Sequence, residues 1–260
     1  MERRDGEARS RGAIEKQGQG EEWMKKVLAV LKDALLPPRC LCCGALVVEE
    51  AFCPVCAVGL MPDEDNYCVI CNQTIRAQSS VRRCLKCAGK KSPYLSVHMA
   101  FEYGGPIREA LLALKHNGRR DLGPRLGRVL AKALRATLPD DITCVVPVPL
   151  HRSRLLDRGY NQAALLAAEL SRLLEVPLDL RMLERHRATP ATRGCNRQER
   201  RQLVAGAFAV ATEPDLQAGT VLLVDDVATT FSTLSECSKT LSGAGVSGVR
   251  VAALARAVVT

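Results

Sequence analysis

The sequence predicts an α/β protein, in which a parallel sheet covered by helices follows a small cysteine-rich module. Beyond residue 93, short aliphatic runs typical of buried strands alternate with segments of helical periodicity, as in sheets whose strands are joined by helices. Before that point, eight of the 12 cysteines form four Cys-x-x-Cys pairs between residues 40 and 87. A chain of 260 residues can hold one mid-sized domain and one such module.

The start of the chain is expected to add little to the core. Residues 1–22 mix charges with almost no apolar side chains, which predicts a disordered tail. Residues 23–36 carry aliphatic side chains at helical spacing and precede Pro37 and Pro38, so we expect a short amphipathic helix that ends there. Docking of this helix on the domain is favoured over a role at a membrane surface.

Composition and charge indicate where the protein is located and what kind of partner it binds. No apolar run reaches the ~18 residues of a membrane span, and the charged start is unlike a signal peptide, so we expect a cytoplasmic protein with no membrane span. The formal charge of +9 suggests polyanionic partners such as phosphates or nucleic acid. Aromatic residues make up 3% of the chain, which disfavours base stacking on aromatic platforms.

Residues 37–92 are predicted to form a zinc-binding module. In a chain without an export signal, paired cysteines indicate metal ligands rather than disulfides, and two pairs complete one tetrahedral site. The spacing suits two ribbons in series with two Zn²⁺ ions, although a cross-braced arrangement would use the same ligands. The predicted ligands are Cys40, Cys43, Cys53, Cys56, Cys68, Cys71, Cys84 and Cys87. Sites made only of cysteine are closed, so we expect structural zinc.

Two further features of the module have alternative interpretations. Cys42 is an extra thiol beside the first pair and could substitute for a neighbouring ligand. Basic residues surround the last pair, at Arg82, Arg83, Lys86, Lys90 and Lys91. Compensation of the negative zinc–thiolate centre is favoured over a contact with nucleic acid, because charge runs are usually solvated faces.

Residues 93–260 are predicted to form the α/β domain. Strands are expected at residues 95–101, 142–148, 206–211, 221–224 and 249–255. Helices are expected at residues 107–115, 122–138, 161–174 and 234–241. Ligands of parallel sheets bind beyond the carboxyl ends of the strands, so the segments that follow the strands are candidate sites.

The segment after strand 221–224 is the most informative of these. Asp225 and Asp226 come where the strand is expected to end, and a turn with four hydroxyl residues (Thr229, Thr230, Ser232 and Thr233) then precedes a helix. Free backbone N–H groups and the helix dipole make such a turn an anion site. Carboxylates would repel a phosphate and suit sugar hydroxyls or Mg²⁺, so the implied ligand is a sugar phosphate. The alternative is an ordinary capped turn.

Two basic segments accompany this turn. A Pro-rich turn after strand 142–148 leads to Arg152, Arg154 and Arg158, whose guanidinium groups suit a second anion such as pyrophosphate. The alternative is that they face water and Asn161 simply caps a helix. Residues 181–201 carry seven arginines without an apolar period, which predicts a mobile loop. Such a loop could close over a polyphosphate, or lie exposed and touch nothing.

Six motifs occur in a characteristic order along the chain. They are the cysteine pairs, Tyr103-Gly104-Gly105-Pro106-Ile107-Arg108, Leu114-Lys115, Pro147-Val148-Pro149, Arg158-Gly159-Tyr160-Asn161-Gln162 and the Asp-Asp segment. In this order they resemble the ComF/GntX family of competence-associated proteins. The resemblance implies a type I phosphoribosyltransferase-like domain behind a double zinc ribbon, binding of phosphoribosyl pyrophosphate (PRPP), and a link to uptake and handling of single-stranded DNA.

The resemblance also implies roles for individual residues. Asp225 and Asp226 would hold the ribose hydroxyls, residues 229–233 the 5′-phosphate, and Arg152 and Arg158 the pyrophosphate, whose departure would need Mg²⁺. The implied reaction, if the protein is an enzyme, is transfer of a phosphoribosyl group. The other reading is a non-catalytic adaptor that binds single-stranded DNA or a competence helicase.

The chain departs from the family pattern at a few positions. Phe231 stands where the family usually has glycine, and a non-glycine residue in the left-handed region costs roughly 1–2 kcal/mol. We expect Phe231 to add bulk at the mouth of the phosphate site and to weaken binding. Thr192, Cys195 and Leu203 stand where the family tends to have Gln, Leu and Asn. These substitutions are expected to affect catalytic activity.

Overall fold

The computed structural model describes residues 37–48, 51–58, 60, 67–75, 82–189, 196–211 and 219–257. The predicted tail at 1–22 and the predicted helix at 23–36 lie outside the described residues. The chain divides into two compact units, residues 1–53 and 54–260. Within the described ranges, no helix is long and apolar enough to cross a membrane.

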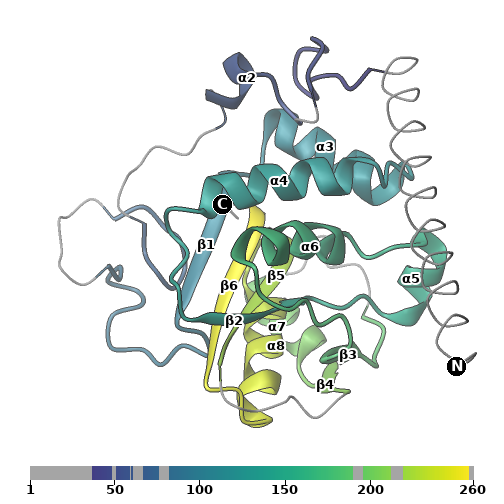
Figure 1. The fold of residues 1–260 in the computed structure, drawn as a ribbon. Coiled ribbons are helices and arrows are strands. Elements are labelled where there is room, and N and C mark those ends of the chain that lie inside the picture. Colours follow the sequence, from purple (N-terminus) through teal and green to yellow (C-terminus); the bar gives the residue numbers. More distant parts are fainter. Residues whose placement is uncertain are drawn as a thin grey trace, which may run out of the picture. The chain divides into compact units, whose positions relative to one another are not determined.

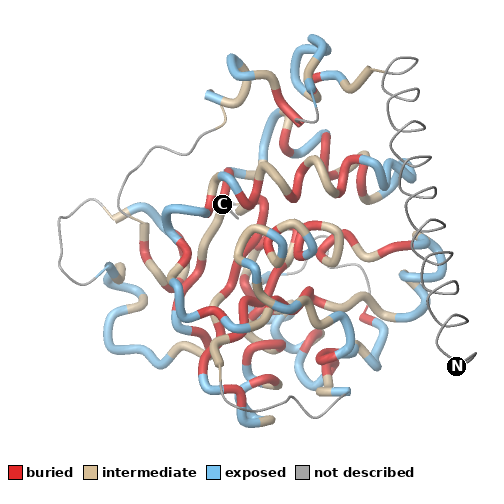
Figure 2. The backbone as a smooth tube through the Cα atoms, viewed as in Figure 1, coloured by how far each residue is buried: buried red, intermediate tan, exposed pale blue. Residues whose placement is uncertain are grey.

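A parallel sheet of four strands forms the centre of the second unit (Figure 1). The strands are β1 (Ser96–Glu102), β2 (Ile142–Pro147), β5 (Thr220–Ala228) and β6 (Gly248–Arg256), in the order β1-β6-β5-β2. Every neighbouring pair is parallel, which confirms the predicted parallel sheet. The central strands β5 and β6 are aliphatic along most of their length because both of their faces are buried (Figure 2).

Helices cover both faces of this sheet (Figure 1). On one face, α4 (Leu122–Leu134) and α6 (Gln162–Leu174) pack on each other and on the strands, and α3 (Gly105–His116) packs on α4. On the other face, α8 (Ser232–Gly243) packs on β5 and β6. The approach of α4 to α6 depends on glycine, since a Cβ on Gly123 would lie 2.5 Å from Leu165 Cδ1.

Several elements differ from the sequence prediction. The strand expected at 206–211 is shorter, as β4 (Phe208–Val210), and it pairs antiparallel with β3 (Leu183–Arg185) in a separate two-stranded sheet. The described parts of the segment predicted as a mobile loop, 181–201, contain β3 and the start of α7 (Arg197–Val204). Two short helices, α2 (Pro54–Val58) and α5 (Arg152–Arg158), were also not predicted.

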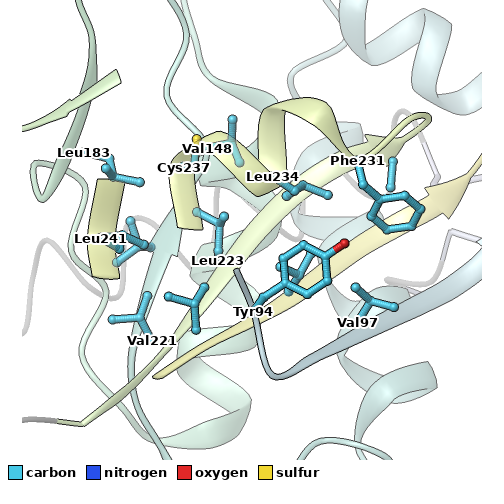
Figure 3. Packing of buried hydrophobic residues seen from close by; sticks show 14 of the residues in the cluster. Tyr94, Val97, Val148, Leu183, Val221, Leu223, Phe231, Leu234, Cys237 and Leu241 are labelled. Atoms are coloured by element: carbon cyan, nitrogen blue, oxygen red, sulfur yellow. The ribbon is translucent and has the colours of Figure 1, made fainter. Parts of the chain in front are cut away.

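The apolar cluster between the sheet and α8 includes Phe231 (Figure 3). Its backbone is left-handed, with φ of 60°, as the departure from glycine led us to expect. Its side chain, however, is only 7% exposed and lies in the same cluster as Tyr94, Val97 and Leu234. The ring is therefore part of the core, and the expectation that Phe231 weakens ligand binding stays a prediction.

Phe231→Gly should lower the free energy of unfolding. Removing the left-handed strain gains roughly 1–2 kcal/mol, but deleting a buried phenyl side chain costs about 3–5 kcal/mol, so a net loss of about 2 kcal/mol is expected in urea unfolding. Phe231→Leu keeps most of the apolar volume and the strain, and should lose less. A glycine variant as stable as the wild type would show that the ring contributes no packing energy.

Candidate functional site

The eight paired cysteines come together in two groups of four. Within each group the sulfur atoms lie within 4.8 Å of one another, and the groups are Cys40, Cys43, Cys53, Cys56 and Cys68, Cys71, Cys84, Cys87. These are the serial sets, not the cross-braced ones. Cys43 Sγ and Cys53 Sγ are 3.7 Å apart, and Cys71 Sγ and Cys84 Sγ are 3.6 Å apart.

These separations fit zinc. Four sulfurs at about 2.3 Å from one tetrahedral ion stand about 3.8 Å apart, whereas a disulfide requires about 2.0 Å. The first pair of each group sits on a tight turn, in which the residue after the second cysteine is left-handed: Gly44 (φ 74°) and Asn72 (φ 50°). Both tetrads are therefore consistent with structural Zn²⁺, and Cys42 belongs to neither.

The second cysteine group is built onto the α/β sheet. Backbone carbonyls of its first turn accept hydrogen bonds from the domain: Val69 O from Val97 N–H (2.8 Å), Ile70 O from the Tyr94 hydroxyl (3.1 Å), and Asn72 O from the Arg256 guanidinium. Cys68 and Ile70 belong to the same apolar cluster as Phe231. Since β1 is the end strand of the sheet, the bond from Val97 to Val69 extends its outer edge.

The acidic pair lies inside a strand, not after one. β5 continues to Ala228, which corrects the expectation that the strand ends at Val224. Its partner β2 ends opposite Val224, whereas pairing with β6 continues past Asp225. Because successive side chains of a strand point to opposite faces, Asp225 and Asp226 have different surroundings.

Asp226 is held by a lysine that the sequence analysis did not single out for a role. Lys115 Nζ, at the end of α3, lies 2.8 Å from Asp226 Oδ2. Burial lowers the pKa of Lys115, but the charge and hydrogen bond of Asp226 outweigh it, so the pKa of Lys115 is raised. Burial lowers the pKa of Arg158, against the opposing charge of Asp226. Both carboxylates were expected to be available to a sugar, but the carboxylate of Asp226 is paired with Lys115.

Asp225 has a different environment on the other face. The side chain is half-buried, and its Oδ1 accepts the N–H of Asp226 at 2.8 Å. Burial, together with the neighbouring charge of Asp226, raises the pKa of Asp225 to about 7. Asp225 lines a small, solvent-open pocket of about 50 Å³, whose other walls are residues 227–234 and Arg200 and Val204 of α7. This carboxyl group can thus meet a ligand in either protonation state near neutral pH.

The predicted phosphate-binding turn forms the rim of this pocket. Phe231 is the N-cap residue of α8, and the hydroxyls of Thr230 and Ser232 lie 2.9 Å apart. Arg200 Nη1 donates to Thr229 Oγ1 at 3.1 Å, so α7 brings a guanidinium to the turn. Hydroxyls, a cation and a helix N-terminus are the groups that bind a phosphate.

Arg200 was missed because its helix was not recognised. The signal was present as a capping box: Asn196 Oδ1 accepts from the N–H of Glu199 at 3.0 Å, and the Glu199 side chain accepts from Asn196 N–H at 2.8 Å. Of the other predicted loop positions, Thr192 and Cys195 lie outside the described residues, and Leu203 lies in α7.

The arginines of the second predicted anion site are divided by α5. Arg158 is half-buried near Asp226, whereas Arg152 is exposed at the other end of the helix, and Arg154 donates to Thr189 O at 2.9 Å. Asn161 caps α6 by accepting from Ala163 N–H at 3.0 Å. The alternative of a plain helix cap therefore holds for Asn161, and only Arg158 is shown beside the acidic pair.

Cys84→Ser should remove zinc from the second tetrad and lower the melting temperature by several degrees, because this group shares a core with the sheet. Metal analysis should give two zinc ions per wild-type chain and one per variant chain. Cys42→Ser removes an exposed thiol outside both tetrads and should change neither quantity. A Cys84→Ser protein with wild-type melting would contradict the shared core.

The raised pKa of Asp225 predicts a pH-dependent stability. The folded state binds the proton more tightly than the unfolded state, so the free energy of unfolding should fall as pH rises from about 4 to about 7. Asp225→Asn removes this titration and should be more stable than the wild type at pH 8, by a margin that shrinks toward pH 5 in urea unfolding. Asp140→Asn, at an exposed acid, controls for the loss of one charge. A margin that does not change with pH would count against the raised pKa of Asp225.

Comparison with known proteins agrees with this architecture. Residues 31–90 match the double zinc ribbon domain. The chain is 32% identical over 229 residues to competence protein F of Haemophilus influenzae, covering 84% of this chain and 97% of that protein. It is 32% identical over 230 residues to the DNA utilization protein YhgH of Escherichia coli K12, covering 81% and 99% respectively. Competence protein ComFC of Bacillus subtilis is 22% identical over 196 residues, covering 74% and 78%.

Among solved structures, a purine phosphoribosyltransferase from Pyrococcus horikoshii aligns with 53% of this chain and 80% of its own, at 20% identity and a TM-score of 0.31. A score of this size is too low to establish a shared fold. The sequence relationship is much stronger, because it extends over nearly the whole length of the curated relatives. The chain therefore belongs to the family of competence protein F and the DNA utilization protein YhgH.

Proposed function

We propose that this protein binds PRPP or a related sugar phosphate at the carboxyl end of β5, in support of DNA uptake or utilization. The observation that carries the proposal is the pocket in which Asp225, the hydroxyl turn and Arg200 meet. The names of the relatives, competence protein F and DNA utilization protein, supply the biological setting.

Each part of such a ligand has a matching group. The 5′-phosphate would lie on the turn at Thr229, Thr230, Phe231, Ser232 and Thr233, where Arg200 adds a cation. The ribose hydroxyls would meet Asp225 and, once released from Lys115, Asp226. Arg158, and Arg152 if it moves, would face a pyrophosphate at C1, with Mg²⁺ supplying further positive charge. If the protein is an enzyme, phosphoribosyl transfer is the reaction that these groups suit.

A second candidate is a non-catalytic adaptor that binds single-stranded DNA or a helicase. The observation that favours it is a basic hollow beside the second cysteine group, lined by Arg83, Lys90 and Lys91 together with Ser92, Tyr94 and Leu95. The ion pair at Asp226 also favours it, because it occupies one of the two acids. Contacts of this kind with nucleic acid would weaken steeply with salt.

Arg200→Gln should weaken PRPP binding about tenfold in calorimetry with Mg²⁺, because a charge-assisted bond to phosphate is lost. Arg201→Gln is the matched control, since it makes the same change one residue along α7 at an exposed side chain outside the pocket lining. Equal affinities of the two variants would contradict the proposed phosphate position.

A parallel titration with single-stranded DNA separates the two candidates. The adaptor would be established if the wild type binds single-stranded DNA at about 50 mM salt but gives no binding heat with PRPP in calorimetry. The double variant Lys90→Gln/Lys91→Gln should then lose the binding of DNA.

A further inference from the structure

The ion pair between Lys115 and Asp226 joins the end of α3 to β5, the strand that carries both acids. Leu114, the neighbour of Lys115, is fully buried, and its carbonyl accepts the Tyr160 hydroxyl. The backbone at the end of α3 is thereby anchored to the segment that carries Arg158. The Lys115 side chain keeps 25% of its surface exposed, whereas that of Asp226 keeps 12%. The lysine is thus the partner that can move.

The ion pair is too buried to open unless another charged group replaces the lost partner. Removing one member of a part-buried ion pair leaves the other charge without a partner, which is costly. A sugar hydroxyl carries no charge and cannot replace the carboxylate as the partner of Lys115. An anionic group can, because an ammonium on a flexible stem exchanges one oxygen anion for another. Arg158 is close enough to Asp226 to interact with its charge, and would attract the same anion.

We propose that Lys115 is a specificity residue, which keeps Asp226 from the ribose until an anionic group at C1 of the ligand takes its place. This rests on the proposed function, and it names the ligand class: a pentose 5-phosphate with a pyrophosphate or similar anion at C1. PRPP draws Lys115 toward its pyrophosphate and frees Asp226 for the ribose hydroxyls. Ribose 5-phosphate lacks that group and leaves the ion pair closed, so it binds more weakly.

The test compares PRPP with ribose 5-phosphate in calorimetry with Mg²⁺, on the full-length wild type and on Lys115→Met. Methionine keeps the length of the stem and removes the charge. The ratio of the two dissociation constants should fall about tenfold in Lys115→Met, within the usual range of coupling between groups. Lys115→Arg keeps a cation and should restore most of the ratio. Lys239→Met removes an exposed lysine from α8 and should leave the ratio unchanged.

The ratio separates specificity from a purely structural role. If Lys115→Met weakens both ligands by the same factor, Lys115 only holds the site together, and the proposal is overturned. An unchanged ratio with unchanged affinities overturns it as well. Wild-type protein that binds neither ligand would instead refute the proposed function, and with it this inference. Because the ratio is taken within one variant, a general loss of stability cancels from it.

Discussion

The continuation of β5 past the end of β2 is the constraint on which the candidate site depends. Up to Val224 the strand has a partner on each side, and beyond it only β6 remains. The overhang keeps strand geometry, so its side chains still alternate between the faces. Asp225 therefore lines the pocket at the start of α8, and Asp226 forms an ion pair with Lys115 of α3. One backbone rule gives two adjacent, identical side chains different environments.

Much of this architecture follows from local patterns in the sequence. Strands β1, β2 and β6 and helices α3, α4, α6 and α8 follow apolar periodicity, which depends on burial alone. The cysteine groups follow from ligand chemistry and spacing. Periodicity gives no sign of α7, whose side chains are mostly polar or charged and whose start depends on one capping box. Nor can it show that β4 pairs with β3, or that Lys115 meets Asp226, since both depend on residues far apart in the chain.

Phe231 shows how a local departure is absorbed by packing. Glycine would adopt the left-handed N-cap of α8 without strain, and phenylalanine does so at a cost. The ring enters an apolar cluster that also contains Ile70, from the second cysteine group, and Val97, from β1. The expected gain from this burial, about 3–5 kcal/mol, exceeds the roughly 1–2 kcal/mol of conformational cost. The substitution therefore ties the turn that rims the pocket to the second cysteine group through a shared core.

The bond between Val69 and Val97 has a consequence for the newly made chain. It pairs one outer amide of β1 with the second cysteine group, at the kind of edge on which strands of other molecules can stack. If the four thiols of this group bind zinc, the metal would order the turn that carries Val69. A chain made without zinc would then leave the edge of β1 exposed, and aggregation through this edge would be expected.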